Sequence, residues 1–319
     1  MALDVAPRHG PLIFVRLILS QPRPTHATRD DSRVALVTCD LFPDLWEDDV
    51  PLRDELRARG LAVDVVSWDD PAADWDAYAL SVLRSPWDYV PRREDFLAWA
   101  GQVPRLLNPA GILRWNTDKV YLRDLEAAGV PITPTTYVGP GETWSPPTTG
   151  EWVVKPTISA GSKDTGRYAL PLQLEMAVAH VERLTTAGRT AMIQPDLEAV
   201  DTDGETALMF FPDAAGRLTF SHAARKGPML TGPDEGGIDP AGEQITARTP
   251  TPSELATAAR VLAAMPRSST PLLYARVDLI PGPDGTPMLL ELELTEPSLF
   301  LRAAPSAAAR LADAIQNRL

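Results

Sequence analysis

Met288-Leu289-Leu290-Glu291-Leu292-Glu293-Leu294 is an apolar run interrupted by two carboxylates, and its composition predicts a strand. Side chains of a strand point alternately to its two faces. We therefore expect Glu291 and Glu293 on one face and the leucines on the other, namely Leu290, Leu292 and Leu294. The apolar stretch from Tyr274 to Ile280, which carries Asp278, is expected to pair with this strand. The C-terminal part of the chain is thus predicted to contain an antiparallel sheet that presents three carboxylates.

These carboxylates indicate a bound cation. Two like charges on one strand face repel each other, and a divalent cation between them would remove the repulsion. Carboxylate oxygens are the hard ligands that Mg²⁺ prefers beside nucleotide phosphates. Asp278, Glu291 and Glu293 are therefore candidate Mg²⁺ ligands. The alternative is the solvated outer face of an edge hairpin, and these residues alone do not decide between the two interpretations.

The use of lysine singles out a second group of residues. The chain has 30 lysines and arginines together, yet lysine occurs only at positions 119, 155, 163 and 226. Where the two residues are interchangeable the chain has arginine, so a retained lysine suggests a place that needs a compact point charge. Contacts to nucleotide phosphates are such places. Chance survival on solvated surfaces is the competing explanation for each lysine taken singly.

The N-terminal part of the chain predicts a small parallel α/β lobe. Three apolar strands are expected at 33–38, 61–66 and 78–84, with a helix from about Pro51 to Arg59 between the first two. Ligands in such sheets bind beyond the carboxyl ends of the strands. The segments Thr38-Cys39-Asp40 and Arg84-Ser85-Pro86-Trp87-Asp88-Tyr89 follow two of these ends and form the candidate substrate edge. Trp87 and Tyr89 could instead anchor a core, because aromatic side chains most often pack.

The remaining elements alternate between helices and strands. Helices are expected at 117–128, 172–187, 253–264 and 305–319, and strands at 151–155 and 191–194. A hairpin is expected from 206–211 and 218–223. A linker rich in proline, glycine and threonine ends at Gly150, and a loop of small residues spans 159–162. The last lobe is thus predicted to be antiparallel with helices.

Composition excludes several classes of protein. The net charge of −13 argues against nucleic-acid partners, which need clustered positive charge. No apolar run approaches the roughly 20 residues that span a bilayer. The single cysteine, Cys39, excludes an intramolecular disulfide framework and a cysteine-based zinc site. We expect a cytoplasmic protein without membrane partners, and we interpret residues 1–32 as a poorly ordered extension rather than a signal peptide or the product of a start codon assigned too early.

The order of motifs resembles the ATP-grasp superfamily over residues 33 to about 305. The motifs are Asp118-Lys119, Val153-Val154-Lys155-Pro156, the loop 159–162, Gln194-Pro195-Asp196-Leu197-Glu198, Asp278 and Glu291-Leu292-Glu293. The resemblance implies an ATP-grasp fold of the α/β class, with an N-terminal parallel α/β lobe followed by two α+β lobes that hold ATP. Its expected domains are a substrate-binding domain at 33–110, a central lid at 111–190 and a C-terminal domain with the metal site at 191–319.

The resemblance also implies roles for single residues. Lys119 and Lys155 would contact the ATP phosphates, beneath a loop containing Ser159, Gly161 and Ser162. The stretch Gln194, Pro195, Asp196 and Leu197 would read the adenine edge, and Glu198 or Asp201 would hold the ribose. Lys226 and Arg276 would stabilise the transferring phosphoryl group. The family pattern commonly ends in Glu-x-Asn, so Glu293 departs from it by adding a negative charge while keeping an oxygen ligand.

Within the superfamily, the chain is most similar to the cyclo-ligases that close O-ureido-D-serine into D-cycloserine, and their relatives. This implies an ATP- and Mg²⁺-dependent, ADP-forming C–N ligase of antibiotic biosynthesis, which activates a small amino acid's carboxylate as an acyl phosphate. A nitrogen of the same molecule would then close the ring. A homodimer is a further expectation from related ligases. The residues expected to bind the substrate are Thr38, Asp40, Ser85, Trp87, Asp88, Tyr89, Glu296 and Ser298.

Three other functions fit the same scaffold. Ligation of two separate amino acids is the nearest variant, and a phosphotransferase would leave phosphate on its substrate. A nucleotide-binding regulatory protein is the third alternative. The three candidate metal ligands and the four lysines argue against the last, because a protein without catalysis has no need of metal-bridged phosphates.

Overall fold

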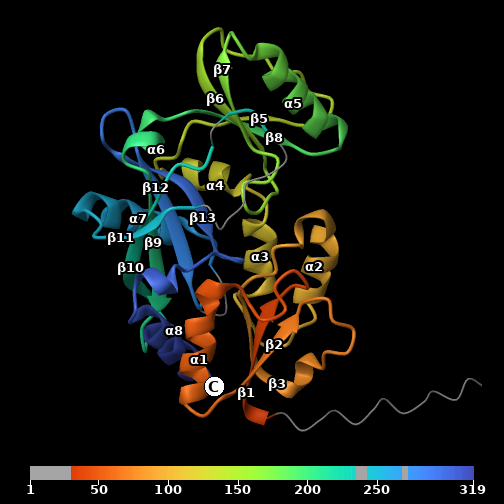
Figure 1. Cartoon of the computed structure of the whole chain (residues 1–319), viewed down its shortest axis with the longest axis vertical. Helices are drawn as coiled ribbons and strands as arrows, with labels where there is room; N and C mark the ends of the chain where they lie inside the picture. The colour runs from red at the N-terminus through yellow and green to blue at the C-terminus, as the bar shows by residue number, and fades with distance from the viewer. Residues whose placement is uncertain (1–29, 231, 235–242, 268–271) are drawn as a thin grey trace, which may run out of the picture.

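The computed structural model describes residues 30–230, 232–234, 243–267 and 272–319, which form three lobes (Figure 1). The extension expected at 1–32 therefore lies outside the described residues, except for its last three positions. Those positions open strand β1, which begins at Asp30 rather than at Arg33. No helix in the described ranges combines the length and apolar character needed to cross a membrane.

The N-terminal lobe is the predicted parallel α/β unit. Its sheet has the strand order β2-β1-β3-β4, and all three pairings are parallel. The strands are β1 (Asp30–Thr38), β2 (Ala62–Ser67), β3 (Tyr78–Leu83) and β4 (Leu106–Leu107), with helices α1 (Val50–Ala58) and α2 (Arg93–Ala100). Gly60 takes a φ of +83° after α1, a conformation that suits glycine and ends the helix as predicted. The expected strands and first helix are confirmed, and α2 and β4 were not predicted.

Two short helices link this lobe to the rest of the chain. They are α3 (Ala110–Asn116) and α4 (Tyr121–Ala127), where one helix was expected at 117–128. The prediction is wrong for the first turn, because the backbone N–H of Lys119 donates to the carbonyl of Thr157 at 2.8 Å instead of to a helical carbonyl. This bond draws Lys119 toward the lid and delays the helix by one turn.

The lid is an antiparallel sheet covered on one face by helix α5 (Leu174–Thr186) (Figure 1). Its strand order is β5-β8-β6-β7. The strands are β5 (Thr136–Val138), β6 (Gly150–Pro156), β7 (Gly166–Leu170) and β8 (Ala191–Pro195). Strands β6 and β8 and helix α5 are confirmed predictions, whereas β5 lies in a segment that was expected to be linker and β7 was not predicted.

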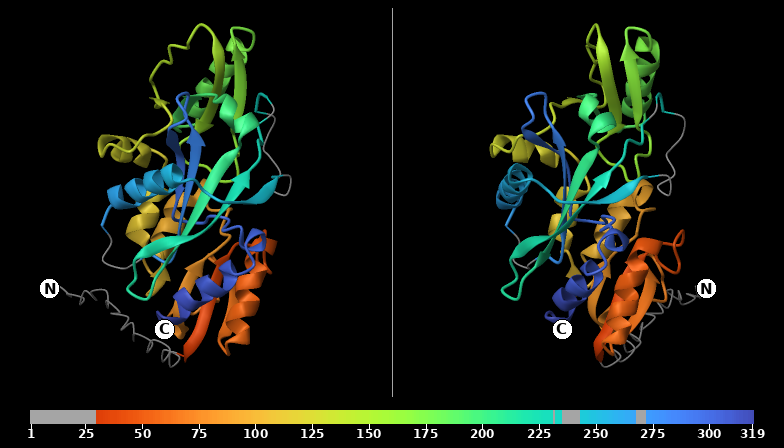
Figure 2. Two further views of the ribbon diagram at one scale, coloured as in Figure 1. Left: turned by 90° about the vertical axis from the view of Figure 1, so that its left-hand side faces the viewer. Right: turned by 60° about the vertical axis from the view of Figure 1, so that its left-hand side comes forward.

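The C-terminal lobe is the predicted antiparallel unit, with strand order β11-β10-β9-β12-β13. In both views of Figure 2 its sheet lies between the lid and the N-terminal lobe. The strands are β9 (Glu205–Pro212), β10 (Leu218–Lys226), β11 (Ile245–Arg248), β12 (Ala275–Pro281) and β13 (Pro287–Glu293). The helices are α6 (Glu198–Thr202), α7 (Pro252–Ala264) and α8 (Ala307–Gln316).

A bulge in β13 corrects one prediction. Asp278 pairs with Glu291 and the next residue of β12, Leu279, pairs with Leu289, so Leu290 is the extra residue. Leu289 is fully buried in the core with Leu292 and Leu294, whereas Leu290 is half-buried and lines the main cavity. The expectation that Leu290 lies opposite the glutamates is therefore wrong, because a bulge interrupts the two-residue period of the strand.

Candidate active site

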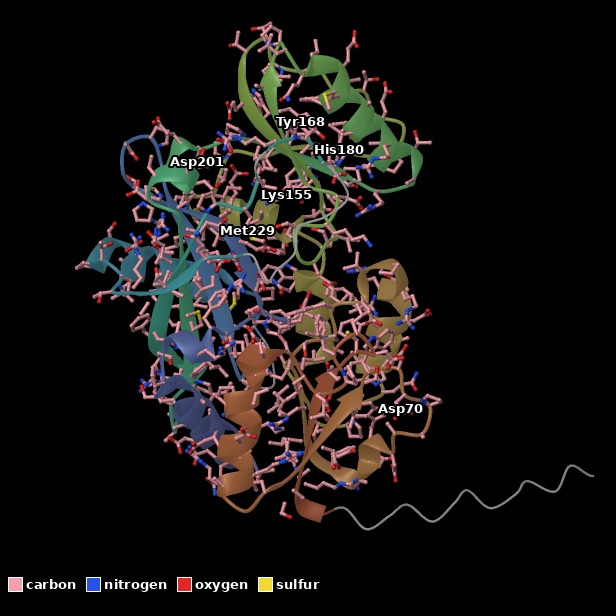
Figure 3. All side chains as sticks on the ribbon, in the orientation of Figure 1. Asp70, Lys155, Tyr168, His180, Asp201 and Met229 are labelled. Atoms are coloured by element: carbon pink, nitrogen blue, oxygen red, sulfur yellow. The ribbon has the colours of Figure 1, made fainter. Side chains whose placement is uncertain are left out.

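A cavity of about 630 Å³ lies where the three lobes meet. The side chains in Figure 3 show Lys155 at this junction, where the lid faces the central sheet. Most residues predicted to bind nucleotide, metal or substrate line the cavity. They are Trp87, Tyr89, Lys119, Lys155, Ser159, Gly161, Ser162, Gln194, Pro195, Asp196, Leu197, Lys226, Arg276, Glu291, Glu293, Glu296 and Ser298.

Seven predicted site residues lie outside the lining. At the sheet edge, the hydroxyls of Thr38 and Ser85 are buried and hydrogen-bonded to each other at 3.0 Å, which leaves them turned inward. Asp88 accepts hydrogen bonds from Trp68 and Arg92 on the lobe's own surface. The other four residues are Asp40, Glu198, Asp201 and Asp278, of which the first three are exposed and the last is buried. The substrate edge thus contributes aromatic side chains to the cavity rather than these hydroxyls and carboxylates.

The two candidates for the ribose differ in what they contact. The carboxylate of Asp201 accepts from Arg167 at 2.7 Å, and Arg167 also pairs with Glu151 and Asp196. Arg167 itself lines the cavity. The carboxylate of Asp201 is thus engaged by a cation from β7, and Glu198 has no ion pair among the residues that the structure describes.

The retained lysines occupy different electrostatic settings. The ammonium of Lys119 lies 3.0 Å from Glu291 Oε1 and donates to the carbonyl of Ser159 at 3.0 Å. Burial opposes its charge, but Glu291 raises the pKa of Lys119 above the usual value. Lys155 has no ion-pair partner within the described ranges, and burial lowers the pKa of its ammonium. Lys155 is therefore a buried amine that forms no ion pair with the described residues, although the charge of Glu291 partly offsets the effect of burial.

Lys226 lies among three carboxylates. Its ammonium is 3.0 Å from Asp278, 2.8 Å from Glu205 and 3.8 Å from Glu243. Burial opposes the charge, and these neighbours raise the pKa of Lys226 well above its ordinary value. Glu205 and Glu243 were missed in the sequence, since neither belongs to a motif or stands at a spacing that relates it to Lys226.

Arg276 holds two of the candidate metal ligands. Its guanidinium donates to both oxygens of Asp278 at 2.8 to 3.2 Å and pairs with Glu293. Burial opposes the charge on Asp278, but Arg276 and Lys226 hold the pKa of this carboxyl below its usual value. Burial together with the charges of Glu291 and Asp278 raises the pKa of Glu293 to about 8. The neighbouring cations therefore neutralise only part of the negative charge of the carboxylates at this end of the cavity.

The residues at β12 and β13 fit a divalent cation. No group of three or more His, Cys, Asp or Glu side chains is gathered as metal ligands within the described part of the chain, and the three candidate carboxylates pair instead with Lys119, Lys226 and Arg276. Asp278 and Glu291 nevertheless stand opposite each other in the ladder, and Glu293 follows two residues later. The donors are hard oxygens, and the raised pKa of Glu293 reflects a repulsion that a divalent cation would relieve.

Glu296 differs from every other carboxylate of the lining. Burial raises its pKa to about 7, and Tyr89 is its hydrogen-bond partner. The indole of Trp87 donates to its backbone carbonyl at 3.0 Å. Within the described residues, Glu296 is the cavity-lining carboxylate that forms no ion pair. This glutamate is therefore available to a cationic group of a ligand.

Apolar lining residues were also missed in the sequence. The missed positions include Phe42, Val153, Val200, Met229 and Leu290. Phe42 packs edge to face against Trp87, with ring centroids 5.2 Å apart. It thus adds to the aromatic side chains, Trp87 and Tyr89, that the sequence predicted at the substrate edge. No sequence signal separates such side chains from ordinary core residues, because packing and ligand contact select the same residue types.

Comparison with known proteins places this site in a family. The family model for the N-terminal domain of D-cycloserine synthetase DcsG matches residues 34–108. The cycloserine biosynthesis protein DcsG of Streptomyces lavendulae is 40% identical over 301 residues, which cover 90% of this chain and 98% of that protein. The chain belongs to the D-cycloserine synthetase family. The protein is accordingly an ATP-dependent carbon–nitrogen ligase, as predicted from its ordered motifs.

Solved structures agree with this family and with the ATP-grasp fold. The crystal structure of D-cycloserine synthetase DcsG matches with a TM-score of 0.78 and 38% identity, covering 90% of this chain and 99% of that one. The ATP-grasp ligase PsnB, solved with a precursor variant, Mg and ADP, matches with a TM-score of 0.58 and 19% identity, covering 90% of this chain and 99% of that one. The fold prediction is confirmed, and this D-cycloserine synthetase relative has the three-lobed ATP-grasp architecture.

Proposed function

We propose that the chain closes O-ureido-D-serine into D-cycloserine with ATP and Mg²⁺, through an acyl phosphate. The observation that carries the proposal is a pair of ionisable side chains in the cavity. Lys155 and Glu296 both line the cavity, and neither forms an ion pair with the described residues. ATP phosphates would supply the anion for Lys155, and the ammonium of an amino acid would supply the cation for Glu296.

The chemistry follows from this placement. An oxygen of the substrate carboxylate attacks the terminal phosphorus of ATP, and ADP leaves. A nitrogen of the same molecule then attacks the activated carbonyl carbon and loses its proton, and phosphate leaves as the ring closes. Water removes the carbamoyl group of the ureido nitrogen, which leaves as carbon dioxide and ammonia, so that D-cycloserine remains. Lys119, Lys226 and Arg276 line the cavity and would offset the negative charge that develops on the phosphoryl group. Holding both reacting groups of one molecule in a single cavity supplies their proximity.

Three carboxylates would hold Mg²⁺ in this scheme, namely Asp278, Glu291 and Glu293. The ion would neutralise charge on the phosphate oxygens. The departure of Glu293 from the common asparagine is balanced by Arg276, which pairs with it. Arg276 therefore offsets the extra negative charge without removing the oxygen donor.

Ribose and adenine would lie toward the lid. The lining there includes Gln194, Pro195, Asp196 and Leu197, and the loop with Ser159, Gly161 and Ser162 faces the same cavity. Gly161 and Ser162 both have positive φ values, 60° and 55°, so this loop is sharply turned. Of the two ribose candidates we favour Glu198, because Arg167 already engages Asp201. We place the reaction in the cytoplasm, where ATP is supplied.

The test measures which products form and in what amounts. Purified protein is incubated with Mg²⁺, ATP and O-ureido-D-serine, and in parallel with D-alanine, D-serine and their pairs. We expect equal amounts of ADP and free phosphate, with D-cycloserine identified by mass spectrometry in the first incubation. A dipeptide as the main product would establish intermolecular ligation instead, and phosphate retained on the substrate would establish a phosphotransferase.

A further inference from the structure

The strand that carries Glu291 and Glu293 lies at the edge of its sheet. β12 is the strand that pairs with β13 in the described structure, and on the outward side Leu289 forms a parallel bridge with residues 131–133. Beyond this bridge the outward N–H and C=O groups have no strand partner among the described residues. An exposed edge of this kind would leave backbone groups unsatisfied or open to other chains. Here the outward groups of Leu292 and Leu294 are satisfied by side chains from the connection between the N-terminal lobe and the lid.

Two residues make most of these bonds. The hydroxyl of Tyr121 donates to the carbonyl of Leu292 and accepts from its N–H, both at 2.8 Å. The amide of Asn116 donates to the same carbonyl at 2.8 Å and accepts from the N–H of Leu294 at 2.7 Å. Both side chains are buried, at 2% and 7% exposure. They thus act as a substitute strand along the outer edge of β13.

The segment that contains Asn116 and Tyr121 also carries a candidate phosphate-binding residue and borders the candidate metal ligands. Lys119 lies between Asn116 and Tyr121, and its ammonium is 3.0 Å from Glu291. Leu292, whose peptide groups are held on the outer edge, separates Glu291 from Glu293. The backbone N–H of Lys119 is also bonded to the carbonyl of Thr157, next to the lid strand that carries Lys155. One segment of six residues, 116–121, therefore fixes a phosphate-binding candidate and the strand of two candidate metal ligands.

We propose that Asn116 and Tyr121 are positioning residues for the Mg²⁺–nucleotide complex, acting through the backbone of β13 on Glu291 and Glu293. Neither residue has to contact the nucleotide for this role. Partners of ligating carboxylates and histidines influence metal affinity by fixing the direction of the ligands. The inference rests on the proposed assignment of the metal site, but it does not depend on which amino acid is the substrate.

The test compares two tyrosines in the full-length protein. Tyr121→Phe removes the hydroxyl that bridges Leu292. Tyr274→Phe is the matched control, since the buried hydroxyl of Tyr274 also makes two backbone bonds, to Leu83 at 3.0 Å and to Thr295 at 2.9 Å. Binding of ADP is measured by titration calorimetry over a series of Mg²⁺ concentrations and in EDTA, and thermal unfolding is recorded for each variant.

We expect Tyr121→Phe to raise the Mg²⁺ concentration needed for half-maximal ADP binding about 10- to 100-fold. ADP binding in EDTA should stay as in the wild type. Tyr274→Phe should lower the unfolding temperature without changing the Mg²⁺ requirement. An unchanged Mg²⁺ requirement in Tyr121→Phe, at the same loss of unfolding temperature as the control, would show a merely structural role and overturn the proposal.

Asn116→Asp supplies a second variant if Tyr121→Phe fails to fold. Aspartate keeps an acceptor for the N–H of Leu294 but loses the donor to Leu292, so the Mg²⁺ requirement should rise less than in Asn116→Ala. Equal Mg²⁺ requirements in Asn116→Ala and the wild type would overturn the proposal. If the wild type binds Mg²⁺ and ADP but forms no ring, the proposed function fails while this inference stands.

Discussion

The junction between the N- and C-terminal lobes differs in kind from the junction between either lobe and the lid. One apolar core contains residues of both terminal lobes, for example Leu36 of β1 and Leu311 of α8. Helices α1 and α8 lie side by side in both views of Figure 2. The lid has a core of its own from residues 138–193, with helix α5 over its sheet, and it contacts the C-terminal core through Met192 of β8 and Tyr137 of β5. The two terminal lobes thus share one core, whereas the lid adds a second core that is joined to the C-terminal lobe by these side chains.

The polar contacts show the same difference. At the first junction the fully buried guanidinium of Arg84 pairs with Asp49 at 2.7 Å and donates to the carbonyl of Pro297 at 2.8 Å. Near the lid, Arg167 forms pairs that remain partly exposed. A buried pair resists separation because breaking it leaves an uncompensated charge, whereas exposed pairs contribute little. Arg84 thus joins the two terminal lobes through a buried contact, whereas Arg167 joins β7 to α6 through a partly exposed pair.

Removal of Arg84 should have the largest effect on stability. Arg84→Ala leaves Asp49 buried without its partner, and we expect a loss of about 3–5 kcal/mol in the free energy of unfolding. Urea unfolding followed by tryptophan fluorescence measures this loss. A change below about 1 kcal/mol, the range of exposed pairs, would contradict the description of Arg84 as a buried, charge-paired residue at this junction.

Matched leucine truncations test whether the two packed units are independent. Leu184→Ala creates a cavity in the lid core, and Leu311→Ala creates one in the core that the two terminal lobes share. Both leucine side chains are at most 1% exposed. Each should cost about 2–5 kcal/mol locally. We expect hydrogen exchange to accelerate mainly within residues 136–195 for Leu184→Ala, and across both terminal lobes for Leu311→Ala. The same exchange pattern in both variants would show that the lid is not a separate unit.

Lys155→Ala tests whether the cavity acts on the nucleotide, rather than how the lobes pack around it. Removing this amine should lower kcat about 100- to 1,000-fold, as for other preorganised electrostatic groups, while the unfolding temperature stays near that of the wild type. ADP release and thermal unfolding measure the two quantities. Glu291→Ala should likewise abolish ADP formation in a folded protein. Full activity in either variant would reject the assignment of the nucleotide site.

Arg167→Gln should have the smallest effect. Its pairs with Asp196 and Asp201 are partly exposed, so the free energy of unfolding should change by less than about 1 kcal/mol. The KM for ATP should rise modestly, because the variant loosens the cavity wall without removing a phosphate contact. Steady-state kinetics at varied ATP measures this change. A loss as large as that of Lys155→Ala would mean that Arg167 acts directly on the nucleotide.

The sequence predicted the parts of this molecule that rest on local patterns. Apolar strands, the end of helix α1 at Gly60 and the ordered lysine and carboxylate motifs could all be predicted, because each has a period or a spacing. Contacts across long separations could not. The bond from Lys119 to Thr157 shortens a helix, the bulge turns Leu290 into the cavity, and Arg167 engages Asp201 from 34 residues away. Each depends on the packing of one element against another, which leaves no local signal.

We propose that Glu296 binds the substrate ammonium, and the titration of this glutamate tests the proposal. Because the pKa of Glu296 is about 7, raised by burial, its carboxylate forms as the pH rises through that value. The measurement is the pH dependence of the KM for O-ureido-D-serine, in the wild type and in Glu296→Gln. We expect the wild-type KM to fall as the pH rises through about 7, and we expect Glu296→Gln to have a KM about 10- to 100-fold higher without this step, at an unchanged KM for ATP. A substrate KM in Glu296→Gln equal to that of the wild type, with the same pH dependence, would contradict the proposal.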